Sequence, residues 1–172
     1  MNAMSLAGKH RGLVADNADP LKLGRLKVRV DAAYGAQPVG DLPWAWPCFP
    51  FGGFADAGFY AVPEVGSGVW AEFQWKDGQP DPTHPVWTGV WLAEGDTPEE
   101  VEGTPEDAHH YKVFKTSSGH VLTFCDKPGE EFIRIRHGKK AQVIFFDKDG
   151  NGTIEIPGLL LYRVGHATME AY

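Results

Sequence analysis

The sequence predicts an all-β protein, and three observations support that prediction. Among the 172 residues, 21 are Gly and 13 are Pro, which interrupt helices and favour tight turns. Aromatic residues, which suit the pleated surface of a sheet, make up 12%. Several short segments alternate between apolar and polar residues, as half-buried strands do. With 42% hydrophobic residues, the chain can bury one sizeable core and a small second module.

The first half of the chain contains two segments with strict strand alternation, residues 24–30 and 69–76. A third strand is expected over residues 86–91. Residues 43–54 are rich in aromatic residues and Pro but have no regular period, so a structured loop with short strand pieces is expected. Six apolar positions of the alternating strands are predicted to face the core: Leu26, Val28, Val30, Ala71, Phe73 and Trp75.

The second half is predicted to be a meander of short strands. Turn-forming residues at 117–119, 127–129 and Gly138 separate its apolar segments. A flat meander exposes both edges and buries little alone, so it is expected to pair with other chains or with the first module. A final run, Leu159 to Tyr162, is expected to add a last strand or to dock on a neighbour. The expected strands are residues 111–116, 120–125, 132–137, 142–146 and 153–156.

An acidic segment separates the two halves. Residues 93–110 contain seven acidic and no basic side chains and very little apolar surface, which predicts a solvated connector. The expected division is therefore a first β module over residues 1–92, a connector over 93–110 and a β-rich segment over 111–172. Neither flanking part has the strong positive charge that phosphate backbones require, which disfavours nucleic acid as a partner.

The sequence also indicates a cellular compartment. Residues 1–13 lack the apolar run of a signal peptide, and no later run approaches the roughly 20 apolar residues that span a bilayer. The chain is therefore expected to fold in a cytoplasm. Cys48 and Cys125 form no CxxC pair, so neither a disulfide framework nor a zinc site is expected, and both are interpreted as buried or incidental thiols.

Three stretches of the sequence resemble one known family. The first two are similar to the OB domain of phage baseplate spike proteins and of the valine-glycine repeat spike proteins of type VI secretion. The third is similar to the stretch where those proteins leave the barrel and begin an intertwined trimeric β-structure. The stretches are GLVADNADPLKLGRLKVRV at 12–30, GFYAVPEVGSGVWAEF at 58–73 followed by PVWTG at 85–89, and KTSSGHVLTFCDKPGE at 115–130.

This resemblance implies an OB-type Greek-key β-barrel over residues 1–92, followed by a short β-meander or β-prism that intertwines in a trimer. The motifs agree physically, because Asp19-Pro20 can start a turn and Gly24 lets the chain enter a strongly bent strand. Relatives commonly continue into a long β-helix, whereas here only residues 111–172 follow the connector. The spike is therefore expected to be short, or to be completed by another chain.

The resemblance also implies a function. The protein would be a non-enzymatic, homotrimeric central spike or hub adaptor of a contractile tail baseplate, linking tail tube and hub proteins to a membrane-piercing tip. A separate tip protein is a possible partner, and contact with the target membrane would be transient. The implied location is the virion tail, after synthesis in the host bacterial cytoplasm. A phage, a tailocin and a secretion system all stay open.

Residues 147–155 imitate a calcium-binding loop, with Asp147, Asp149 and Asn151 at ligand positions. Position twelve of that loop is Gly158 rather than a carboxylate, and the residues before Asp147 have the pattern of a strand rather than a helix. Asp-Gly and Asn-Gly are also preferred hairpin turns. A β-hairpin is therefore the main prediction, and bound calcium is the alternative.

Histidines provide a second candidate metal site. Three copies of His109-His110 around an axis could gather at a metal ion, but no carboxylate or Cys at ligand spacing supports this, so a solvated pair is expected. His120 is interpreted as shaping a turn, without chemistry. No metal or cofactor is predicted.

The aromatic residues of the 43–54 segment could form a stacking platform for single-stranded nucleic acid, which is a common use of OB barrels. However, residues 43–69 contain no basic side chain, and stacking without cations makes a poor nucleic-acid site. Barrel packing or contact with hub or tube subunits is therefore favoured, and an OB-fold nucleic-acid module is the alternative function. The aromatic residues are Trp44, Trp46, Phe49, Phe51 and Phe54.

No catalytic residue is predicted. The sequence lacks the common nucleophile, metalloprotease, nucleotide-binding and dinucleotide-binding motifs. Glu99 and Glu100 are adjacent carboxylates, but on a solvated connector they would have no low-dielectric pocket to raise a pKa.

Overall fold

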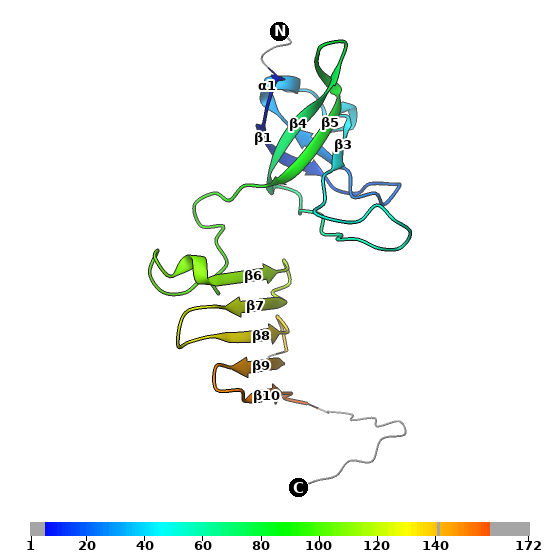
Figure 1. Cartoon of the computed structure of the whole chain (residues 1–172). Helices are drawn as coiled ribbons and strands as arrows, with labels where there is room; N and C mark the ends of the chain where they lie inside the picture. Colours follow the sequence, from blue (N-terminus) through cyan, green and yellow to red (C-terminus); the bar gives the residue numbers. More distant parts are fainter. Residues whose placement is uncertain (1–5, 141, 159–172) are drawn as a thin grey trace. The chain divides into compact units, whose positions relative to one another are not determined.

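The computed structural model describes residues 6–140 and 142–158 (Figure 1). The chain divides into two compact units, Met1–Asp96 and Thr97–Tyr172. Strands dominate the described part of both units, so the all-β prediction is confirmed. Within the described residues, no helix is long and apolar enough to cross a membrane.

The first unit is a closed barrel in the order β1-β2-β3-β5-β4, with β4 pairing back to β1 (Figure 1). Neighbouring strands are antiparallel except β3 and β5, which are parallel. Five strands closed in this way form an OB barrel, which confirms the predicted OB-type fold. The strand bounds are β1 His10–Asp16, β2 Leu26–Arg29, β3 Trp44–Pro47, β4 Gly68–Lys76 and β5 Gln79–Val90.

Two short helical turns, α1 Asp31–Tyr34 and η2 Val39–Asp41, lie between β2 and β3. The strand expected over residues 86–91 is the end of a longer strand, β5, and β3 is one of the strand pieces expected in residues 43–54. The core that these strands enclose consists of Leu6, Val14, Leu26, Val28, Val30, Ala45, Val69, Ala71, Phe73 and Trp87.

Strand alternation predicted most of the core correctly but was wrong for Trp75. Its side chain is 61% exposed. Trp75 pairs with Pro80 next to the turn between β4 and β5, where no further strand pairs with the hairpin. The alternation therefore continues along β4, but the core that would cover its last apolar residue does not extend that far.

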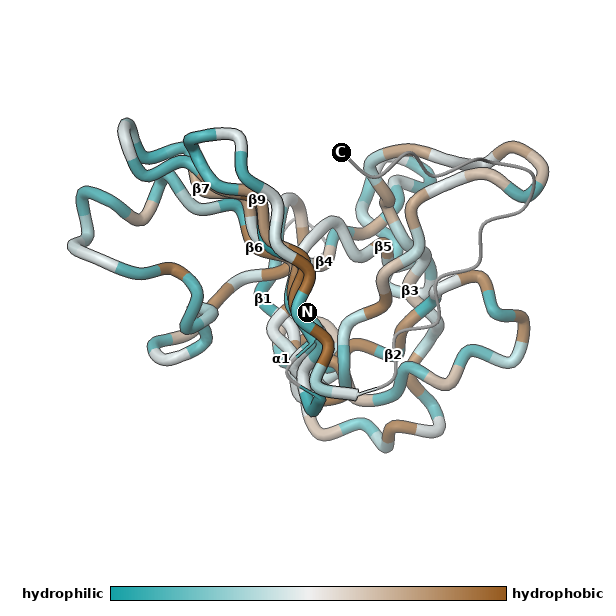
Figure 2. Tube along the Cα trace, turned by 90° about the horizontal axis from the view of Figure 1, so that it is seen from below, coloured by the Kyte–Doolittle hydropathy of each residue, from teal (hydrophilic) through white to brown (hydrophobic). Residues whose placement is uncertain are grey.

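The second unit contains an antiparallel sheet in which β6 to β10 follow one another in sequence order. Figure 2, a view from below, shows β6, β7 and β9 one behind another. The predicted meander is confirmed, and two of its expected turns contain glycines at φ +83° (Gly119) and +80° (Gly129). The strand bounds are β6 Tyr111–Lys115, β7 Val121–Cys125, β8 Phe132–Arg136, β9 Val143–Asp147 and β10 Gly152–Glu155.

The segment predicted to connect two modules is divided between them. The boundary falls between Asp96 and Thr97, so residues 97–110 belong to the unit that contains the sheet. These residues end in a short helical turn, η3 Ala108–His110, which leads directly into β6. The run from Leu159 to Tyr162, expected to form a last strand or to dock on a neighbour, lies outside the described residues.

Candidate assembly surfaces

One face of the β6–β10 sheet carries apolar side chains on every strand. The register of the strands aligns these side chains in two rows that run across the sheet. Leu122 is half-buried, and the others range from 37% exposed for Ile144 to 65% exposed for Ile154. A continuous exposed apolar surface of this kind marks an interaction site. We call it the apolar face: Phe114, Leu122, Ile135, Ile144 and Ile154 in one row, and Phe124, Ile133 and Phe146 in the other.

The opposite face of the same sheet is partly covered. On β7 it presents Val121, Thr123 and Cys125, all of which are buried. A single layer of strands cannot bury its own surface, so another segment must lie over β7. Residues 97–110 are in position to do so, because the amide N of Asp126, next to the end of β7, donates to the carbonyl O of His110 at 3.0 Å. We call residues 97–110 the cap, and the face that they cover the capped face.

Glu100 fixes the other end of the cap. Its carboxylate accepts hydrogen bonds from the Lys115 Nζ at 3.0 Å and from an Arg136 Nη2 at 2.6 Å. Lys115 on β6 and Arg136 on β8 belong to one cross-strand row, with buried Val121 of β7 between them. Glu100 therefore bridges two cations across the width of three strands.

The two adjacent glutamates of the cap differ strongly. Glu99 reaches the same two cations but its side chain is 73% exposed, whereas that of Glu100 is 2% exposed. The expectation that both lie on a solvated connector is therefore wrong for Glu100. Burial would raise the pKa of Glu100, but hydrogen bonds from Lys115 and Arg136 outweigh burial and lower it. A general acid needs a raised pKa, so this environment does not favour acid catalysis.

In the barrel, Asp19 organises the loop between β1 and β2. Its buried carboxylate accepts hydrogen bonds from the backbone N of Leu21 at 3.0 Å and of Leu23 at 2.8 Å, and from the Arg25 Nη2 at 2.6 Å. The Arg25 hydrogen bonds hold the pKa of Asp19 far below its usual range, against the effect of burial. The predicted turn at Asp19-Pro20 is thus confirmed, and it is held by a buried ion pair.

Gly24 ends this loop and shows why the motif needs a glycine. Its φ is +76°, and a Cβ at this position would lie 2.9 Å from the Phe49 ring. The Gly24 carbonyl also accepts a hydrogen bond from the Trp87 Nε1 at 3.0 Å. The loop therefore presses directly on the aromatic residues that follow β3.

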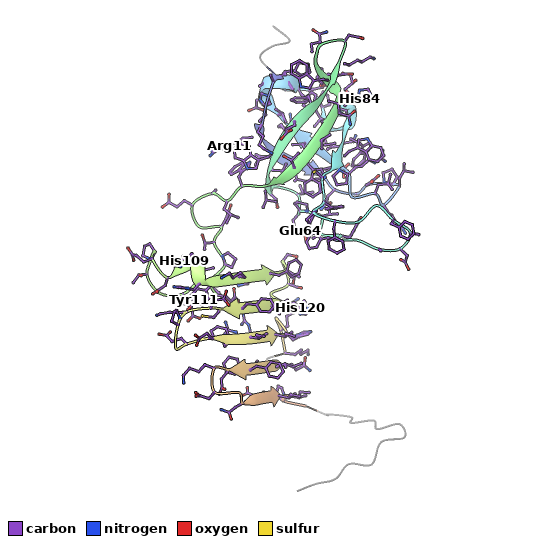
Figure 3. The ribbon with its side chains drawn as sticks, viewed as in Figure 1. Arg11, Glu64, His84, His109, Tyr111 and His120 are labelled. Atoms are coloured by element: carbon purple, nitrogen blue, oxygen red, sulfur yellow. The ribbon has the colours of Figure 1, made fainter. Side chains whose placement is uncertain are left out.

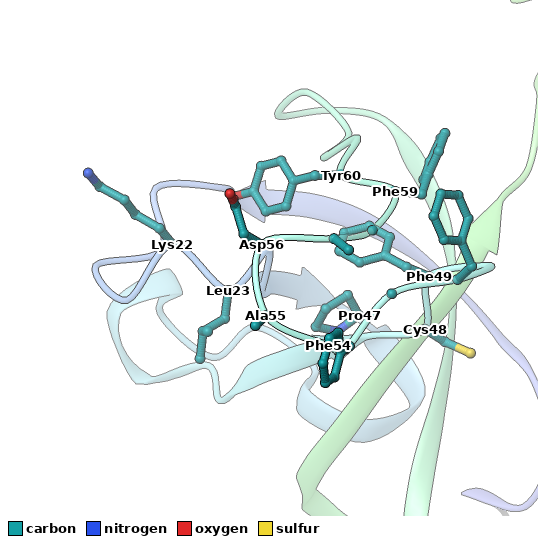
Figure 4. A pocket seen from close by; sticks show the side chains of 15 residues that line it. Lys22, Leu23, Pro47, Cys48, Phe49, Phe54, Ala55, Asp56, Phe59 and Tyr60 are labelled. Carbon is teal, nitrogen blue, oxygen red and sulfur yellow. The ribbon is translucent and has the colours of Figure 1, made fainter.

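Residues 48–60 form an aromatic finger (Figure 4). Its base is anchored on the core, because the Phe49 ring packs edge-on against buried Trp87 with 5.3 Å between centroids. The two limbs meet through a hydrogen bond from the Phe59 N to the Phe51 O at 3.1 Å. Gly52 allows this approach, since a Cβ there would lie 2.9 Å from the Gly58 Cα.

The finger presents apolar side chains to solvent. Phe54, near its tip, is 82% exposed, and the finger borders a hollow of about 980 Å³. Among the residues that line this hollow, only Lys22 and Asp56 are charged (Figure 4). Cys48, expected to be a buried or incidental thiol, is exposed at the same hollow.

The structure brings cations onto two of the aromatic rings, which the sequence did not indicate. The Arg25 guanidinium lies 5.5 Å from the ring centroids of Trp44 and Trp46, and the Lys27 Nζ lies 5.3 Å from that of Trp44. Both cations already have partners. Arg25 is paired with Asp19, and Lys27 donates to the carbonyl O atoms of residues 39 and 40. Neither is therefore available as a free phosphate contact.

The predicted hairpin at Asp147 is confirmed, because β9 and β10 pair on either side of the turn. The Asp147 carboxylate accepts hydrogen bonds from the backbone N of Asp149 at 2.9 Å and of Asn151 at 2.8 Å. Calcium binding at this loop stays an alternative prediction.

His109 and His110 lie with their ring centroids 3.9 Å apart, and His109 Nδ1 is 2.7 Å from the Glu106 O. At the far end of β6 lies His120 (Figure 3), and its ring meets that of His137 with 4.3 Å between centroids, a pair that sequence reasoning missed. Over residues 6–140 and 142–158, no group of three or more His, Cys, Asp or Glu side chains could hold a metal ion.

The closed five-stranded barrel, with its buried Asp19 loop, defines the first unit as an OB-type domain. Residues 10–92 match the family model of the type VI secretion system/phage-baseplate injector OB domain. The barrel is thus similar to this family's domain, as the resemblance implied, and the match supports a structural role in a baseplate. The match covers β1 to β5 and ends before the cap and the sheet. No curated protein matches the chain.

Proposed function

We propose that this protein is a non-enzymatic central spike or hub adaptor of a contractile tail baseplate, in which three copies assemble through the apolar face. The apolar face is the observation that carries the proposal. One of its rows extends over all the strands from β6 to β10 and the other over β7 to β9, and a single copy leaves both largely in water. Burying a half-exposed Ile or Phe contributes about 1 kcal/mol, so the whole face favours association strongly.

Three copies suit the geometry of such a face. Three flat sheets around one axis can turn their apolar faces inward and form a prism, and the family resemblance also implies a trimer. The rows would then stack along the axis, with each strand hydrogen-bonded to the next. A continuous hydrogen-bonded structure of this kind resists compression, which is the load on a spike.

The remaining surfaces have proposed partners in the same machine. The aromatic finger, with its anchored base and exposed tip, suits insertion into an apolar pocket of a hub or tail tube protein. In the described chain β10 pairs only with β9, so its other edge could receive a separate tip protein. The proposed location is the tail of the virion, with only transient contact with the target membrane.

The alternative is an OB-fold nucleic-acid module. In OB barrels the β2–β3 surface is a usual site for oligonucleotides. Here Arg25, Lys27 and Arg29, which lie on or next to β2, are engaged within the protein. This occupancy favours a protein interface over a phosphate-binding groove.

The mass of the purified full chain in solution tests the proposal. We expect a trimer by native mass spectrometry in the absence of nucleic acid, and no detectable binding of single-stranded oligonucleotides at moderate salt. A monomer that binds oligonucleotides with salt-dependent affinity would overturn the proposal in favour of the nucleic-acid module.

A further inference from the structure

We infer that the cap determines which face of the β6–β10 sheet can assemble, and that Glu100 is the residue that positions the cap. The inference rests on the proposed assembly through the apolar face. It assigns a specificity role to residues 97–110, so that copies of this chain associate only through the side of the sheet that the cap leaves open.

The sheet needs such a device because both of its faces carry apolar side chains. Besides the apolar face, the capped face presents Val113, Val121, Phe132, Val143 and Phe145. If both faces were open, each sheet could bind neighbours on both sides, and association would not close at three copies. Covering one face restricts assembly to the other.

Glu100 is suited to set the position of the cap because a buried carboxylate tolerates few alternatives. Removing a charge from water is costly unless hydrogen bonds and opposite charges compensate. Over this sheet the compensation comes from Lys115 and Arg136, on either side of Val121. A cap displaced along or across the strands would bury Glu100 without these partners, so the pairing defines one docking position.

The remaining contacts of the cap lie toward the opposite end of β7. The Asp107 carboxylate is 3.6 Å from the Lys127 Nζ, and His110 accepts the backbone hydrogen bond from Asp126. The cap is thus held at both ends of β7. Neutralising Glu100 would release the end near Lys115 and leave two cations close together, with only the exposed Glu99 beside them. Near Cys125 the cap would then depend on the Asp107–Lys127 pair and the His110–Asp126 hydrogen bond, so the whole cap should open more often and expose Cys125.

The buried thiol of Cys125 offers a direct measure of whether the capped face is open. Cys125 lies on that face, while Cys48 is exposed and can be removed by Cys48→Ser. In this background we would compare Glu100→Gln with Glu99→Gln, which neutralises the neighbouring carboxylate that contacts the same cations. The readouts are the rate of Cys125 modification by a thiol reagent and the native mass of the full chain.

For Glu100→Gln we expect Cys125 to react about tenfold faster or more, because a charged hydrogen-bond pair that holds the cap is lost. We also expect species larger than the trimer. Glu99→Gln should match the parent in both readouts. Equal Cys125 rates in the two variants would overturn the inference.

These outcomes separate the inference from the proposed function. A monomeric parent protein would refute trimeric assembly, yet the Cys125 rates would still show whether Glu100 holds the cap. A trimeric parent whose Glu100→Gln variant stays a trimer with a protected Cys125 would refute the inference alone.

If Glu100→Gln loses its β-sheet circular dichroism, Arg136→Gln is the second variant, since it removes one of the two bonds to Glu100. It should give a smaller acceleration in the same direction, and no acceleration would count against the inference.

Discussion

At the scale of single residues, two buried carboxylates hold segments of this chain in place through ion pairs. Asp19 ties a loop of the barrel to Arg25, and Glu100 ties the cap to Lys115 and Arg136. Both carboxylates have a lowered pKa because their cationic partners outweigh the effect of burial. Each therefore stays ionised at neutral pH and acts in structure rather than in proton transfer.

Replacing Asp19 tests how much its ion pair with Arg25 contributes to stability. Asp19→Asn should lower the melting temperature of the protein by several degrees, because it weakens the bonds to Arg25 and to the loop backbone. Asp16→Asn is the matched control, since Asp16 makes one exposed hydrogen bond, to the backbone N of Ala18. Thermal unfolding followed by circular dichroism measures both. A variant at Asp19 as stable as the control would contradict the structural role of the loop.

The lowered pKa of Asp19 also predicts how the stability of the protein depends on pH. A lowered folded-state pKa means that the stability contributed by Asp19 is present at neutral pH and above the ordinary aspartate pKa of about 3.9. That contribution is lost only as the pH falls through the lower folded-state pKa. The difference in stability between the parent and Asp19→Asn should therefore shrink only in strongly acidic solution.

At the scale of elements, the two ends of the aromatic finger have different roles. Phe49 at the base packs on the barrel core, and Phe54 near the tip is exposed. Phe49→Ala should destabilise the barrel by roughly 2–4 kcal/mol in denaturant unfolding, because Phe49 packs on buried Trp87. Phe54→Ala should leave stability unchanged, because that side chain is exposed. In assembled particles, however, Phe54→Ala should be depleted if the finger docks on a hub or tube protein. Normal incorporation of this variant would contradict the docking role.

Strand alternation allowed much of the fold to be predicted from the sequence. It predicted the inward side chains of β2 and the order of the meander, because each depends on local pattern and turn residues. It could not predict the exposure of Trp75, since that depends on where the ring of the barrel ends. Nor did composition indicate the shape of the finger, which depends on the contact of its two limbs at Gly52 and Gly58.

The candidate surfaces were only partly predictable for the same reason. The acidic composition of residues 93–110 correctly indicated an exposed segment at most of its positions. Glu100 is the exception, and its only signal in the sequence was the pair of basic residues, Lys115 and Arg136, at inward positions of two strands. Recognising their meaning requires the register of β6, β7 and β8, which places both in one row.

At the scale of the whole molecule, the two units have different tasks in the proposed assembly. The barrel is complete in itself, because its core is closed by its own strands. The sheet is incomplete, because one face is partly covered by the cap and the other is left exposed by the described residues of its own unit. This asymmetry is the reason to place the interface between copies on the sheet rather than on the barrel.

The most direct test of assembly through the apolar face compares two variants, each with one added charge, on opposite faces of the sheet. Ile144→Lys introduces it into the apolar face, while Thr153→Lys introduces it on the neighbouring strand and the opposite face. Native mass spectrometry of both full-length variants should give a monomer for Ile144→Lys and a trimer for Thr153→Lys, because only the first charge would be buried on assembly. A trimer that tolerates Ile144→Lys as well as it tolerates Thr153→Lys would contradict assembly through the apolar face.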